Sequence, residues 1–287
     1  MKGCKLSKYL CVSPVCLLML AVLLAPTASA QSSETKIGTD AAEASEKGIV
    51  SILGGPSSVG AQLGKDRKAK GTFFPLPRLS DRYFRFKNQV EEEYGFSFGL
   101  DYNALFQVAN DSLGEDKAAG GVFRTYGQWI LFGKDSENTG TLVYKVENRH
   151  RLGTDIAPKG LGSEIGYAGL TAVTFSDIGW ALTNLYWSQH LLNNRVGFVA
   201  GVVDTTDYVD VYGLVNPWTD FNNYAFTTNP TIPAPDQGLG AAVRVMPTEN
   251  IYIVAGIADA NGDPTDIGDS VNSFFSESEF FTHIEVG

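Results

Sequence analysis

Charged and aromatic residues alternate with apolar ones in several short segments of this 287-residue chain. On the polar side of these segments lie Arg124, Tyr126, Lys145, Glu147, Arg149, Tyr186 and Arg244. The planar guanidinium group of arginine can make two hydrogen bonds at once, and a tyrosine ring can stack on a flat apolar surface. These seven residues therefore suit weak, reversible contact with a solute. The same charges could instead pair across neighbouring strands and brace them, and both interpretations remain open at this point.

Carboxylates, which are common metal ligands and catalytic groups, gather in two further stretches. The first holds Asp204, Asp207 and Asp210, and the second is ADANGDPTD over residues 258–266. The second lacks the ligand spacing and closing glutamate of an EF-hand, and the three histidines are far apart, so we expect no metal and no cofactor. A glycoside hydrolase could use Glu147 and Asp204, but no local pattern marks a catalytic pair and no G-x-S-x-G motif occurs. We therefore expect that the protein is not an enzyme.

A period of two dominates from residue 96 onward and predicts β-strands with one apolar and one polar face. FSFGLDYNALF from Phe96, VFRTYGQWILF from Val122 and TLVYKVENRHR from Thr141 follow this pattern. Further strands are expected at 164–174, 181–190, 194–204, 238–246, 251–258 and 279–286. Residues 216–237 contain four prolines, which cannot pair within a central strand, and are expected to form a long loop.

The chain before residue 96 divides into three parts. Residues 1–30 have the form of a cleavable export signal, with a lysine-rich start, a short apolar stretch and small residues before the expected cut. The apolar stretch is about ten residues long, whereas a helix that spans a bilayer needs roughly twenty. Residues 31–72 are expected to form a flexible polar leader. Residues 73–95 contain an amphipathic helix, expected at about 80–93, with Ser80 and Asp81 as caps and Gly95 as its stop.

Composition limits the possible cellular compartments and the possible classes of binding partner. All three cysteines lie in the predicted export signal, so the mature chain is expected to contain no thiol for a disulfide or a zinc site. The net charge is −10. Loss of the signal with its three lysines brings the charge to about −13, which argues against nucleic acid as a partner. Three fates remain for such an exported chain: the periplasm, secretion, or insertion into an outer membrane as a β-barrel.

Two all-β architectures fit the alternating segments. A soluble β-sandwich that binds carbohydrate would alternate, and so would the wall of a membrane barrel. The segment 141–151 carries full charges on one face and aliphatic or aromatic residues on the other, as a strand between water and lipid requires. We therefore predict an antiparallel transmembrane β-barrel over residues 96–287, preceded by the short amphipathic helix. An exported sandwich is the alternative, and a glycoside hydrolase is a weaker one.

Several segments resemble the carbohydrate-selective porin family (OprB type) of Gram-negative outer membranes. They are VENRHRLGTDIAP from Val146, GVVDTTDYVDVYGLVNP from Gly201, the stretch over 232–265, and FFTHIEVG from Phe280. The resemblance spans about residues 73–287 and implies a barrel of roughly sixteen antiparallel strands, with a constricted, charged lumen through which small sugars diffuse passively. It also implies an outer-membrane location, with small carbohydrates and outer-membrane lipid as partners, and it allows for a homo-trimer.

The number of expected strands is smaller than that family's barrel requires. About nine strand candidates occur before Gly287, and the last residues lack the terminal aromatic usual in such proteins. We therefore expect residues 96–287 to be the N-terminal part of the family's porin domain.

Overall fold

The computed structural model describes residues 54–68, 77–211 and 216–287. The predicted export signal and most of the predicted leader lie outside these described residues.

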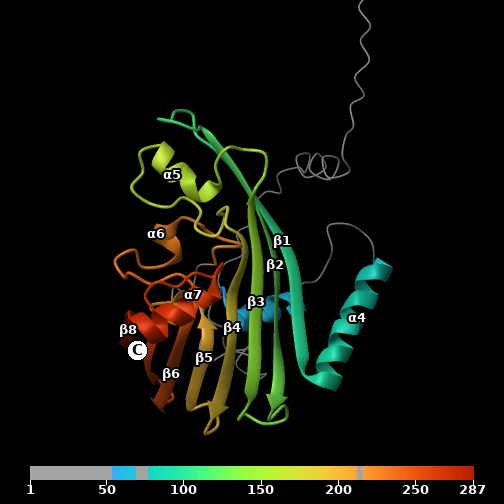
Figure 1. The fold of residues 1–287 in the computed structure, drawn as a ribbon. Helices are drawn as coiled ribbons and strands as arrows, with labels where there is room; N and C mark the ends of the chain where they lie inside the picture. The colour runs from blue at the N-terminus through green and yellow to red at the C-terminus, as the bar shows by residue number, and fades with distance from the viewer. Residues whose placement is uncertain (1–53, 69–76, 212–215) are drawn as a thin grey trace, which may run out of the picture. The chain divides into compact units, whose positions relative to one another are not determined.

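Eight antiparallel strands form one sheet, in which each strand pairs with the next along the chain (Figure 1). The strands are β1 (Phe96–Val108), β2 (Lys117–Phe132), β3 (Gly140–Arg151), β4 (Gly179–Leu191), β5 (Val196–Val203), β6 (Gly238–Thr248), β7 (Ile251–Asp259) and β8 (Phe280–Val286). Over the described residues β1 and β8 do not pair with each other, so the sheet is open. A single sheet of sequential hairpins is the topology of part of an up-and-down barrel wall and differs from the two stacked sheets of a sandwich.

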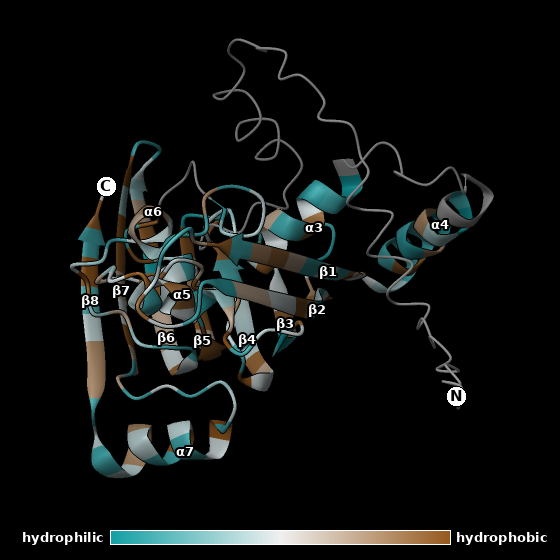
Figure 2. Cartoon of the chain, turned by 90° about the horizontal axis from the view of Figure 1, so that it is seen from above, coloured by the Kyte–Doolittle hydropathy of each residue, from teal (hydrophilic) through white to brown (hydrophobic). Residues whose placement is uncertain are grey.

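The sheet has an apolar face, called here the outer face, and a polar face, called the inner face. On β1, Leu100 and Tyr102 are exposed on the outer face, whereas Asp101 and Asn103 are half-buried on the inner face. Exposed apolar side chains continue across the outer face on the other strands, among them Trp129, Trp180, Leu185, Phe198, Val243, Ile251 and Ile284. In Figure 2, brown apolar stretches recur along the strands between paler and teal ones. An apolar surface of this extent requires contact with lipid or with another apolar surface.

Five helices accompany the sheet in the described part of the chain. They are α3 (Val59–Lys68), α4 (Pro77–Tyr94), α5 (Leu161–Glu164), α6 (Tyr224–Thr227) and α7 (Ile267–Asn272). Three further single turns are η1 (Pro158–Gly160), η2 (Thr205–Asp207) and the π-turn η3 (Ser273–Glu277). Among the helices described, none has the length and apolar character needed to cross a bilayer.

Helix α4 confirms the predicted amphipathic helix, with a different start. It begins at Pro77, before the expected caps Ser80 and Asp81, because proline is favoured in the first turn of a helix. It ends at Tyr94, and Gly95 follows it as the predicted stop. Gly95 has a φ of +69°, and its backbone N–H donates to the carbonyl of Glu91 at 2.9 Å. This left-handed position favours glycine because a side chain there would be strained.

The strand predicted at 164–174 is wrong. This stretch holds the end of α5 and an irregular loop, in which Gly166 has a φ of +73°. Ala172 of this stretch and Phe175, which directly follows it, pack on Val122 of the inner face. The alternation that suggested a strand therefore comes from a loop that packs onto the sheet.

The predicted polar leader also needs correction, because residues 59–68 form helix α3. Ser58 begins this helix, and its Oγ accepts from the backbone N–H of Ala61 at 3.4 Å. Val59 and Leu63 are buried against Tyr126 and Val143 of the sheet. The segment is polar, as predicted, but two apolar side chains one turn apart are enough to dock it on the sheet.

Candidate functional site

The centre of the inner face carries two rows of polar residues that the strand register places side by side. In one row, Asp101 of β1 pairs with Arg124 of β2, and Arg124 pairs with Glu147 of β3. In the next row, Tyr126 pairs with Lys145, and Lys145 pairs with Asn184 of β4. We call these six residues, together with Arg149, the polar wall. Antiparallel pairing brings them together because residues two apart on one strand share a face.

Two ion pairs stabilise the polar wall. The Nε of Arg124 donates to Oδ1 of Asp101 at 2.7 Å, and its Nη2 donates to Oδ2 at 2.5 Å. The Nε of Arg149 donates to Oε2 of Glu147 at 2.7 Å, and the Glu147 residue is 0% exposed. A buried carboxylate needs such a partner because burial removes its hydration. The structure therefore shows that Arg124 and Arg149 act at least as braces of the wall.

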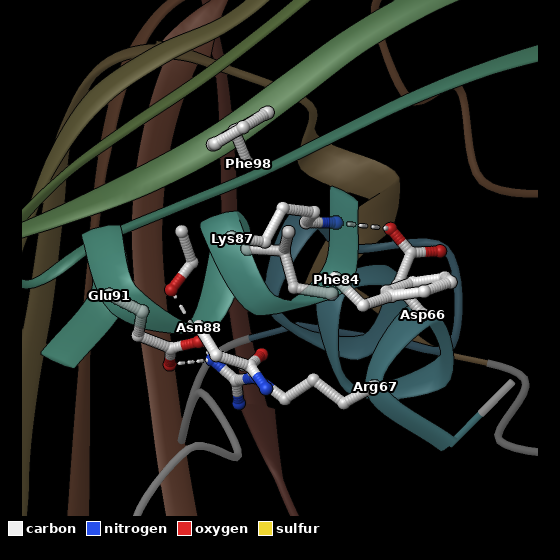
Figure 3. A pocket seen from close by; sticks show the side chains of 9 residues that line it. Asp66, Arg67, Phe84, Lys87, Asn88, Glu91 and Phe98 are labelled. Carbon is white, nitrogen blue, oxygen red and sulfur yellow. Dashed lines mark hydrogen bonds and ion pairs between the residues drawn. The ribbon is translucent and has the colours of Figure 1, made fainter. Parts of the chain in front are cut away.

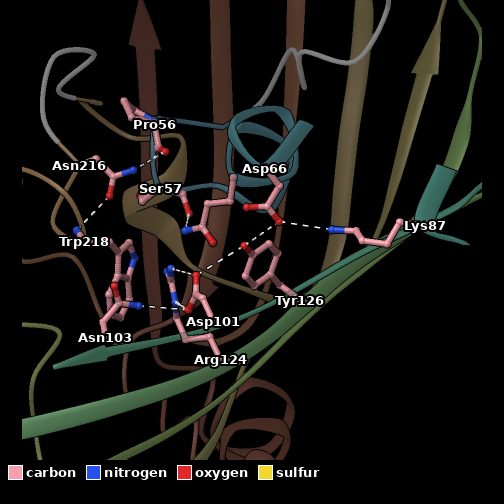
Figure 4. Close-up of polar contacts among 11 residues, drawn as sticks. Pro56, Ser57, Asp66, Lys87, Asp101, Asn103, Arg124, Tyr126, Asn216 and Trp218 are labelled. Atoms are coloured by element: carbon pink, nitrogen blue, oxygen red, sulfur yellow. Dashed lines mark hydrogen bonds and ion pairs between the residues drawn. The ribbon is translucent and has the colours of Figure 1, made fainter. Parts of the chain in front are cut away.

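Aromatic rings lie against the same charges (Figure 4). The guanidinium carbon of Arg124 is 3.8 Å from the ring centroid of Trp218, which belongs to the β5–β6 connection. The hydroxyl of Tyr126 donates to Oδ2 of Asp66 on α3 at 3.2 Å. The inner face thus combines charged groups with flat rings, a combination that can contact both the hydroxyls and the apolar faces of cyclic polyols.

Asp207 of the first acidic stretch lies close enough to the polar wall for the charge of Lys145 to act on it. Asp204 caps η2, where its Oδ1 accepts from the backbone N–H of Thr206 at 3.0 Å. Asp207 is buried and accepts a hydrogen bond from the hydroxyl of Ser57 at 3.2 Å. Burial, together with the negative charge of Asp204, raises the pKa of Asp207 to about 6, although Lys145 opposes this rise. Asp207 therefore takes up a proton at a higher pH than an exposed aspartate does.

The carboxylates of the second acidic stretch are engaged in local hydrogen bonds. Asp259 accepts hydrogen bonds from the hydroxyl groups of Ser270 at 2.6 Å and Ser273 at 2.8 Å. Asp266 caps α7 by accepting from the backbone N–H of Asp269. In the part of the chain that the structure describes, no three His, Cys, Asp or Glu side chains are grouped to hold a metal ion.

The seven residues singled out from the sequence all lie on the inner face. Five of them belong to the polar wall. Tyr186 of β4 lies beside it and packs with Tyr126 and Val143. Arg244 is apart from the others, on β6, where its guanidinium carbon lies 4.9 Å from the ring centroid of Tyr252. The register confirms the predicted parity of these side chains, whereas their contact with a solute stays a prediction.

Sequence reasoning passed over four residues that the structure adds to the site. Asp101 has the same parity as the charges on β2 and β3, and Asn184 has the same parity as Tyr186 on β4, so alternation could have identified both. Asp66 and Trp218 come from a helix and a loop that carry no strand pattern. No signal in the sequence places either of them against the wall.

The class of protein follows from the two faces and the topology. Sequential antiparallel strands, an apolar outer face and a charged inner face are the features of the wall of an outer-membrane β-barrel of the porin type. The eight strands make up part of such a barrel.

Comparison with known proteins identifies the family. The family model "Carbohydrate-selective porin, OprB family" matches residues 83–284, and the chain belongs to this family. The solved high-pH structure of OprB from Pseudomonas putida is similar in fold, with a TM-score of 0.51 and 13% sequence identity. The similarity covers 71% of this chain and 50% of that one, so the chain spans about half the length of the solved protein. A search of curated proteins found no match.

Proposed function

We propose that the protein forms a pore in the outer membrane of a Gram-negative bacterium, through which small carbohydrates diffuse passively. The observation that carries this proposal is the difference in polarity between the two faces of the sheet. An apolar outer face suits lipid, and a charged, ring-bearing inner face suits a water-filled path. Membership of the OprB family supports carbohydrates as the solutes.

The proposed solute path follows Arg124, Tyr126, Lys145, Glu147, Arg149, Tyr186 and Arg244. Passage needs no bond to be made or broken, so the chain acts as a channel and not as an enzyme in this proposal. Selectivity would arise from the width of the path and from side chains that bind solutes weakly enough to release them. Because Arg124 and Arg149 are held by ion pairs, their donors keep fixed positions, which favours passage of solutes whose hydroxyls match that spacing.

The remaining partners of this proposal are outer-membrane lipid and further copies of the chain. Lipid would cover the outer face, and a homo-trimer would cover part of it with neighbouring copies. Export by cleavage after residue 30 would deliver the chain to that membrane.

Liposome swelling tests the proposal. Purified protein reconstituted into liposomes should raise the swelling rate in an isotonic monosaccharide several-fold over protein-free liposomes. It should raise the rate much less in an oligosaccharide too wide for the pore, because diffusion through a constriction falls steeply with solute size. Equal rates with and without protein, in preparations whose protein floats with the lipid, would contradict a pore.

A further inference from the structure

Residues 54–68, called here the plug segment, lie on the inner face of the sheet. The segment contains α3 and lies outside the residues that match the family model. Val59 and Leu63 are its buried apolar side chains, and they contact Tyr126 and Val143 in the cluster that also receives Tyr186. The plug segment therefore covers two of the seven residues proposed to line the solute path, Tyr126 and Tyr186.

Hydrogen bonds hold the start of the plug segment to the β5–β6 connection. The hydroxyl of Ser57 donates to Oδ1 of Asp207 at 3.2 Å. The side-chain amide of Asn216 donates to the carbonyl of Pro56 at 2.9 Å (Figure 4). The connection itself is anchored on the inner face, because Tyr208 and Val209 pack on strands β5 to β7. The start of the plug segment is thus bonded to the β5–β6 connection, which itself packs on the inner face.

Ion pairs hold the end of the plug segment to α4. Arg67 pairs with Glu91, and Nζ of Lys87 lies 3.5 Å from Oδ2 of Asp66. These side chains surround a cavity of about 270 Å³ between α3, α4 and β1 (Figure 3). Both pairs are partly exposed, so each contributes little to holding the helix.

The contact between the plug segment and the sheet differs from a hydrophobic core, because it buries polar atoms without partners. Nη1 of Arg124 and Oε1 of Glu147 are buried without a hydrogen-bond partner among the described residues, and so is Oε1 of Gln62 on α3 itself. Buried polar groups without partners are costly, and water or a hydroxylated solute would satisfy them. Burial of only two apolar side chains offsets a small part of the entropy lost when about fifteen residues become ordered. The contact between the plug segment and the sheet is therefore weak for the number of residues that it orders.

From this geometry, and resting on the proposed pore function, we propose that the plug segment restricts the solute path and moves aside when solutes pass. Its displacement exposes Tyr126 and Tyr186 and gives water access to the unpartnered atoms of the polar wall. The width of the path is then set by α3 in addition to the barrel wall. Such a device would keep the pore narrow at rest.

A disulfide can fix the plug segment in place. A Cβ built on Gly55 would lie 3.7 Å from the Cβ of Val211, a separation that suits a disulfide. In the Gly55→Cys/Val211→Cys variant, we expect oxidation to lower the monosaccharide swelling rate at least threefold, and a reductant to restore the wild-type rate. Each single variant serves as the control, because neither can form the bond. Equal rates for the oxidised, reduced and wild-type forms would overturn the proposal.

A charged side chain placed between α3 and the sheet should instead raise the swelling rate. Leu63→Glu places a carboxylate in the buried contact, whereas Gly64→Glu places the same group at the next residue, where a Cβ has nothing within 4 Å. We expect Leu63→Glu to raise the swelling rate at least twofold over wild type, and Gly64→Glu to leave it unchanged. The same rate in both variants would contradict a plug at this position.

A second readout separates failure of the plug from failure of the pore. In a Val143→Cys background, a water-soluble maleimide should label the thiol at least tenfold faster with Leu63→Glu than with Gly64→Glu, because α3 covers Val143. Equal labelling rates overturn the plug whatever the liposomes do. Fast labelling in liposomes that never swell would show that Leu63→Glu displaces α3. It would also overturn the proposed pore function, and with it the role of the plug segment.

Discussion

At the scale of single residues, the polar wall is held together by charges that differ in burial. The side chain of Glu147 is almost fully buried and that of Arg149 nearly so, and they form one ion pair. Two residues further along β3, Arg151 pairs with Asp177, and both of these side chains are well exposed. Water screens the exposed pair, whereas removal of a buried partner leaves a carboxylate without compensation.

This contrast yields a prediction for two arginines on one strand. Arg149→Ala should lower the free energy of unfolding by about 3 kcal/mol, because it removes the hydrogen-bonded partner of a buried carboxylate. Arg151→Ala should lower it by less than about 1 kcal/mol, because its pair is exposed. Urea titration of the protein folded in detergent micelles measures both values. Losses of similar size would show that burial does not distinguish the two pairs.

At the scale of elements, two glycines report on how α3 meets the sheet. Gly64 lies within α3, and a Cβ built there has open space around it. Gly99 lies on the inner face of β1, where a Cβ would run into the ring of Tyr126 and would approach Oδ2 of Asp66 to 2.8 Å. Alanine favours a helix over glycine, whereas an added methyl group in a close contact displaces its neighbours.

Alanine at these two positions should therefore change α3 in opposite directions. Gly64→Ala should stabilise the helix by about 0.5–1 kcal/mol and slow amide hydrogen exchange in residues 59–68 by roughly two- to fivefold. Gly99→Ala should speed that exchange, because it pushes Tyr126 away from Asp66. Exchange in β3, which neither substitution touches, is the internal reference. Unchanged or faster exchange in the Gly64→Ala protein would count against a helix docked as described.

At the scale of the whole molecule, the sheet separates two environments. Apolar side chains stay exposed on its outer face from β1 to β8, while the inner face receives α3, the connection 152–178 and the described residues 204–211 and 216–237 of the β5–β6 connection. The second of these holds the long loop expected for Asn216 to Gln237, which contains only the short helix α6. Long connections that fold inward narrow the inner side, and short turns such as 249–250 join the strands at the other end.

Two exposed valines test whether lipid covers the outer face. Val243 in the middle of β6 is 40% exposed, and Val271 on α7 is 41% exposed, so their accessibility is matched. Val243→Arg should destabilise the protein folded in a lipid bilayer by about 2–4 kcal/mol, because it places a charge near the bilayer centre. Val271→Arg should have an effect within about 0.5 kcal/mol. Both are measured by urea titration in lipid vesicles, and equal effects would place Val243 outside the membrane.

The sequence by itself determined the strands, their two faces and helix α4. Alternation is a local property, because successive side chains on a strand point in opposite directions whatever lies beyond them. Arg124, Lys145 and Glu147 could therefore be assigned to one face before the register was known, and Gly95 could be recognised as the end of a helix. The same local rule produced the error at 164–174, where Gly166 turns the chain out of any strand.

Only the tertiary structure decided what covers the inner face. The hydrogen bond from Ser57 to Asp207 joins residues 150 positions apart, and the one from Asn216 to Pro56 joins residues 160 apart. Likewise, Trp218 meets Arg124 from a loop whose sequence carries no periodic pattern. Contacts of this kind depend on how segments pack in space and not on the residues beside them in the chain. The sequence thus determined the wall of the proposed pore, and the packing of distant segments decided how far that pore is filled.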